Sequence, residues 1–82
     1  MKVYVCPAPI LGALIEFEEF KILRSEGAEM DKMRDKLDNA LREIEFAFQM
    51  YQENRRAALK NRDKVELLRS LILEAIEGLQ VA

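Results

Sequence analysis

Apolar residues recur every three or four positions through the middle of the chain, the spacing of one face of an α-helix. The pattern predicts one long helix over about residues 28–60. Its apolar stripe would consist of Met30, Met33, Leu37, Ala40, Leu41, Ile44, Ala47, Phe48, Tyr51 and Ala58. Asn61 follows, and we expect this residue to end the helix in a left-handed conformation.

A shorter helix is predicted before it, over about residues 9–25. Pro9 suits the first helical turn, where its missing N–H costs nothing, and Gly27 suits a C-terminal stop. The inner face of this helix would be formed by Ile10, Leu14, Phe17 and Phe20. Residues 1–8, which contain Pro7 and are followed by Pro9, are expected to form an extended arm.

A third helix is predicted over about residues 64–77. Asp63 and Glu66 have the spacing of a capping pair at its start, and Gly78 is expected to stop it. Its apolar stripe would be formed by Val65, Leu68, Ile72, Ala75 and Leu79, widened by Leu71 and Ile76.

These elements indicate an all-α fold in a single domain of 82 residues. At 1.5 Å per residue the central helix would be roughly 48 Å long and each flanking helix roughly 25 Å. Two short helices folded back on one long helix give an antiparallel hairpin arrangement only two helices thick. A chain this small has a thin core, so we expect a second copy to complete a helical bundle with coiled-coil-like packing.

The opening of the chain is uncharged from Val3 to Ile15 and contains the only cysteine, Cys6. A membrane-spanning helix needs about 20 apolar residues, and this run is shorter and broken by prolines. We therefore interpret it as part of the fold and not as a membrane or targeting segment. A lone cysteine is typical of a reducing compartment, so we expect a cytoplasmic protein.

The composition argues against catalysis. The chain has no histidine and only two serines, so the usual proton shuttle and the usual partner of a nucleophile are missing. Paired carboxylates occur at Glu16, Glu18, Glu19, Glu43 and Glu45. Carboxylate-bridged metal sites in helical bundles also use histidine, so solvated helix faces explain these residues better. We expect a non-enzymatic protein without cofactor or metal.

A second apolar face is predicted on the central helix, because Phe46 lies about 200° round the helix from Ile44. Aromatic and methionine side chains in such a patch are typical of binding surfaces. The candidate interface residues are Phe46, Met50, Ala57, Phe17 and Phe20. They suggest an adaptor, chaperone, inhibitor or regulator that binds itself as a homodimer and an unidentified protein. The alternative is that the flanking helices overlap there and cover both faces.

A basic block interrupts a chain whose net charge is −2. Residues 54–64 contain one acidic residue and five basic ones, namely Arg55, Arg56, Lys60, Arg62 and Lys64. These side chains could bind phosphates, which makes a nucleic-acid-associated regulator the alternative function. Cations also suit the C-terminal end of a helix, so a solvated helix end is the simpler interpretation.

Overall fold

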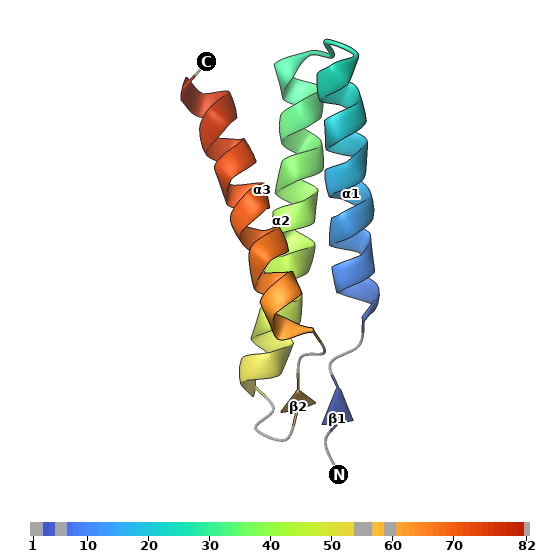
Figure 1. Ribbon diagram of the computed structural model, residues 1–82, viewed down its shortest axis with the longest axis vertical. Coiled ribbons are helices and arrows are strands. Elements are labelled where there is room, and N and C mark those ends of the chain that lie inside the picture. Colours follow the sequence, from blue (N-terminus) through green and yellow to red (C-terminus); the bar gives the residue numbers. More distant parts are fainter. Residues whose placement is uncertain (1–2, 5–6, 54–56, 59–60, 82) are drawn as a thin grey trace.

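A computed structural model describes residues 3–4, 7–53, 57–58 and 61–81 (Figure 1). Within these ranges the chain forms three helices and two strands of two residues each. The elements are β1 (Val3–Tyr4), α1 (Ala8–Ser25), α2 (Met30–Glu53), β2 (Ala57–Ala58) and α3 (Arg62–Val81). The prediction of an all-α fold is therefore confirmed.

The three helices lie lengthwise in a molecule measuring 47 × 20 × 17 Å. α1 and α2 lie side by side and are joined by a short loop at the upper end of Figure 1. α3 crosses α2 near the lower end and leans away from α1 towards the C-terminus. α2 is thus the central element, with one flanking helix on each side.

The turn after α1 follows the prediction for Gly27, which has a φ of +72°. Its amide donates to the carbonyl of Arg24, and the amide of Ala28 donates to the carbonyl of Leu23. These two bonds form a Schellman motif, in which a left-handed residue reverses the chain and satisfies the last helical carbonyls. The motif places α2 directly beside α1.

The central helix is shorter than predicted. α2 ends at Glu53, whereas the pattern predicted a helix to residue 60. Ala57 and Ala58 instead form β2, which pairs in parallel with β1 in the register Val3 to Ala57 and Tyr4 to Ala58. Alanine favours a helix, but the propensity is weak and backbone pairing with a distant strand overrides it here.

Asn61 is left-handed as predicted, with a φ of 56°, but it precedes α3 and does not end α2. Its carbonyl accepts from the amides of Lys64 and Val65 at 2.9 and 3.1 Å. α3 therefore begins at Arg62, two residues earlier than predicted. It also continues through Gly78, because this glycine does not adopt the positive φ that would end the helix.

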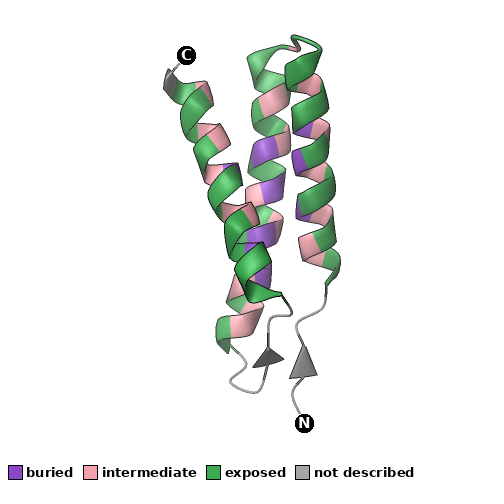
Figure 2. Cartoon of the chain, in the orientation of Figure 1, coloured by how far each residue is buried: buried purple, intermediate pink, exposed green. Residues whose placement is uncertain are grey.

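The core lies where the three helices face one another, as the buried segments in Figure 2 show. Its buried members are Ala13, Phe17, Phe20, Leu37, Ala40, Ile44, Ala47, Val65 and Ile72. Leu14, predicted to be internal, is exposed, and Ala13 takes the internal place. A methyl group added at Gly12 would meet the carboxylate end of the flexible Glu43 side chain of α2.

Candidate interaction surface

α1 carries apolar residues on two opposite faces. Leu11, Ile15 and Ile22 are each between 55% and 58% exposed. Their spacing places them in one stripe, which we call the α1 outer face, about 180° round the helix from the buried Ala13. A helix that is apolar on both sides is typically buried on both sides. This face was not predicted from the sequence, although the spacing of residues 11, 15 and 22 indicates it.

Phe46, one of the residues predicted to form an apolar face on the outside of α2, is 53% exposed. Met50 is only half-buried but packs against the core. Ala57 belongs to β2 and not to α2, and its side chain lies outside the described part of the chain. The three residues therefore do not form the continuous patch that an unbroken helix would have given.

Phe46 borders a shallow hollow of about 460 Å³ where the start of α1 meets α2. The hollow is lined by Ala8, Pro9, Arg42, Glu43 and Phe46. A small apolar side chain would fit against the proline and the aromatic ring, next to one cation and one carboxylate.

Phe17 and Phe20 are core residues, which corrects their assignment to an interface. Their rings stack with centroids 5.7 Å apart, and both are buried. The Nζ of Lys21 lies 5.6 Å from the Phe17 ring centroid, and the Arg24 guanidinium lies 5.2 Å from that of Phe20. The two cations cover the rings, because a positive charge is attracted to the face of an aromatic ring.

The same two rings form one side of a larger hollow, of about 590 Å³, between α1 and α3. It opens where α3 leans away from α1 in Figure 1. The lining combines apolar and charged residues from both helices: Phe17, Phe20, Lys21, Arg24, Leu71, Glu74, Ala75, Gly78 and Leu79.

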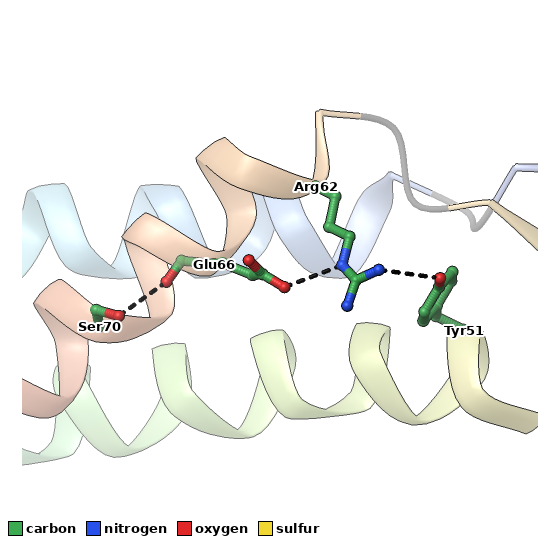
Figure 3. A network of polar contacts seen from close by, with 4 residues as sticks. All are labelled: Tyr51, Arg62, Glu66 and Ser70. Atoms are coloured by element: carbon green, nitrogen blue, oxygen red, sulfur yellow. Dashed lines mark hydrogen bonds and ion pairs between the residues drawn. The ribbon is translucent and has the colours of Figure 1, made fainter.

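Three residues of the predicted anion-binding block, Arg55, Arg56 and Lys60, lie outside the described residues. Arg62 is held within the chain (Figure 3): its Nε donates to Glu66 at 2.9 Å and its Nη1 to the Tyr51 hydroxyl at 3.3 Å. The hydrogen bond to Glu66 raises the pKa of Arg62 above its usual value.

The guanidinium of Arg62 also lies 5.3 Å from the Tyr51 ring centroid, so this cation joins α3 to α2. Lys64, the remaining member of the block, is exposed on the first turn of α3. Of the two described cations in the block, Lys64 is therefore exposed, and Arg62 is engaged in a contact that joins α3 to α2.

Four of the five carboxylates singled out from the sequence take part in ion pairs along the helices. The fifth, Glu43, is in no ion pair with a described residue, and its Oε2 is buried without a hydrogen-bond partner. Lys36 Nζ lies 2.5 Å from Glu19 and 3.6 Å from Glu16, and these two carboxylates raise the pKa of the Lys36 ammonium. Glu18 pairs with Lys21 at 2.8 Å, and Glu45 pairs with Arg69 of α3.

No group of three or more metal-ligating side chains occurs among residues that the structure describes. None of the helices in that part of the chain has the length and apolar character needed to cross a membrane. Cys6 lies outside the described residues.

Comparison of the chain with models of protein families, with curated proteins and with solved structures gave no match. The α1 outer face exposes three large aliphatic side chains, and α3 exposes Leu67 and Leu71.

Proposed function

We propose that this chain is a non-enzymatic cytoplasmic protein that acts by binding another protein, as an adaptor, chaperone, inhibitor or regulator, and that it does so as a homodimer. The observation that carries the proposal is the α1 outer face. Three large aliphatic side chains lie in one exposed stripe on a helix whose opposite face is already buried.

The exposed area on α1 supplies part of a binding free energy. Full burial of an aliphatic side chain is worth about 1.5–3 kcal/mol, so completing the burial of a half-exposed one contributes about 1 kcal/mol. Leu11, Ile15 and Ile22 together would then contribute about 3 kcal/mol. Specific complexes need more than this, which is why we expect a partner that also contacts polar residues around the stripe.

The dimer follows from the thinness of the fold. In our proposal the three helices form an antiparallel unit, which is half of a larger bundle. The single chain leaves eight large apolar side chains substantially exposed within the described ranges, and these are spread over all three helices. Association with a second copy covers some of them and leaves others for a different protein.

Capture of partners from the native host tests the proposal. The double variant Ile15→Asp/Ile22→Asp should lose the captured protein while keeping the wild-type circular dichroism spectrum, because both side chains are exposed. A double variant with the same charge change on the outer side of α2, Asn39→Asp/Gln52→Asp, should retain it. Equal retention by both double variants would contradict a role for the α1 outer face.

The nucleic-acid alternative gives a different result in the same experiment. Retained material would then be released by nuclease, and its binding would weaken steeply as the salt concentration rises. It would also be insensitive to substitutions at Ile15 and Ile22. That pattern would replace the protein-binding proposal.

A further inference from the structure

One exposed side of α3 has a pattern that is complementary to itself. Lys64, Leu67, Leu71 and Glu74 follow one another at spacings of three, four and three, which places them in one stripe along the helix. Leu67 is 59% exposed and Leu71 is 41% exposed. Lys64 and Glu74 are also exposed, and no ion pair between described residues involves either of them. We call these four residues the α3 stripe.

We propose that a second copy of this chain docks on the α3 stripe, with the two α3 helices antiparallel about a twofold axis. Leu67 then packs on Leu71 of the partner subunit, and Lys64 faces Glu74 of the partner subunit. The inference rests on the homodimer of the proposed function and names its surface.

The register follows from the positions of the four residues. In an antiparallel pair related by a twofold axis, a residue faces the one that lies equally far on the other side of the centre. Lys64 and Glu74 lie equally far from residue 69, and so do Leu67 and Leu71. One register therefore joins apolar to apolar and cation to carboxylate along the whole stripe.

The residue at the centre does not oppose this pairing. Arg69 is turned towards α2, where it pairs with Glu45 and lies 5.8 Å from the Phe48 ring centroid. Two arginines consequently do not meet at the twofold axis. Lys64 and Glu74 are about 15 Å apart along their own helix, so a contact between them has to be made between chains.

The hollow between α1 and α3 enlarges the surface available to the partner helix. Leu71 and Glu74 belong both to the α3 stripe and to the lining of this hollow. Gly78 lies one turn further along, and apart from its chain neighbours and the nearby α3 backbone no described atom lies within 4 Å of the position that a Cβ would occupy there. A helix approaching this side can come close to the backbone, which adds contacts to a pair of leucines too small to make a standard interface of about 800 Å² per partner.

The α1 outer face is less suited to self-association. Glu18 lies between Ile15 and Ile22 in the same stripe and is exposed. When two such stripes cross at their centres, two carboxylates come together, and like charges that face each other are destabilising. The α3 stripe places its charges at the ends and its leucines in the middle, so its copies attract along their full length.

The test uses charge reversal in the full-length chain and measures the dimer Kd by sedimentation equilibrium. Lys64→Glu alone makes both interchain contacts acidic, and Glu74→Lys alone makes both basic. Each should raise the dimer Kd about tenfold or more, since two attractive pairs become repulsive. In an equimolar mixture of the two variants, one chain is acidic and the other basic at both positions, so a heterodimer of wild-type Kd should form.

Glu77→Lys provides the matched control, because it makes the same charge change on an exposed position of α3 outside the stripe. It should leave the Kd unchanged. An unchanged Kd in both single variants, or a mixture that fails to dimerise, would overturn the α3 placement while leaving a dimer in place. A wild-type protein that stays monomeric at every concentration would overturn both this inference and the homodimer of the proposed function.

Discussion

α1 and α3 both pack on α2, but they do so to different extents. α1 contributes three buried residues, two of them phenylalanines, and packs along α2 more extensively than α3 does. Among its described side chains, α3 contributes Val65 and Ile72 to the buried core, and it leaves a hollow of about 590 Å³ beside α1. Aromatic burial therefore holds one flanking helix, while the other is attached through fewer and smaller side chains.

This difference indicates that one flanking helix stabilises the single chain and that the other is available for an interaction. The side of α1 that faces α2 has no spare apolar surface, since its phenylalanines are already stacked and covered by cations. α3, in contrast, borders an open hollow, and two of its leucines are exposed. We therefore expect the packing of α1 on α2 to determine the stability of the single chain. We expect α3 to be the helix that contacts a second copy.

The largest expected effect is the loss of the main aromatic anchor of α1. Phe20→Ala removes a ring that is 2% exposed, which should lower the free energy of unfolding by about 3–5 kcal/mol because the cavity fills only partly. Urea denaturation at a fixed protein concentration measures the change. A loss below about 1 kcal/mol would mean that α1 is not the tightly packed helix.

The corresponding change in α3 should have a smaller effect. Ile72→Ala removes the fully buried residue of α3, and we expect a loss of about 2–3 kcal/mol in the same denaturation experiment. The space around α3 is open on the side of α1, so neighbouring side chains can move into the cavity. A larger loss for Ile72→Ala than for Phe20→Ala would invert the comparison between the two helices.

A gain in stability is expected at Gly78. Its backbone is helical and the space around it is open, so Gly78→Ala should raise the free energy of unfolding by about 0.5–1 kcal/mol through the lower entropy of the unfolded chain. The measurement belongs in a Leu67→Asp background, where contacts with a second copy are weakened. A loss of stability there would show that a part of the same chain packs against Gly78.

The smallest effect is the pH dependence of the contact between Lys36 and its two carboxylates. Glu19 and Glu16 raise the pKa of Lys36 in the folded state, so the stabilisation is complete below about pH 10 and is lost as the pH rises above the folded-state pKa. The urea midpoint of the wild type should fall slightly more than that of Lys36→Met between pH 9 and 11.5. Parallel pH profiles would show that this ion pair does not contribute.

The sequence was sufficient to predict the elements that depend on residues close together along the chain. Periodicity located three helices, and Gly27 ended α1 because a left-handed glycine satisfies the helix end through bonds to nearby carbonyls. The stripe of α2 was also identified, since Leu37, Ala40, Ile44 and Ala47 are buried as their spacing implies.

The remaining features depend on contacts between distant segments. The end of α2 could not be predicted because Ala57 and Ala58 leave the helix to pair with β1, more than 50 residues away. Ala13 rather than Leu14 is buried, because the packing of α1 on α2 decides which of the two apolar sides of α1 turns inward. Phe17 and Phe20 are buried in the single chain for the same reason, whereas the exposed large apolar side chains, which include Phe46, lie outside the core on all three helices.

The central claim is that the chain is a homodimer held by α3, and its mass in solution tests this most directly. Light-scattering chromatography of the wild type should give the mass of two chains. The variant Leu67→Asp/Leu71→Asp should give the mass of one chain with an unchanged circular dichroism spectrum, because both leucines are exposed in the single chain. A wild type with the mass of one chain, or a variant that remains a dimer at the same dilution, would contradict the account.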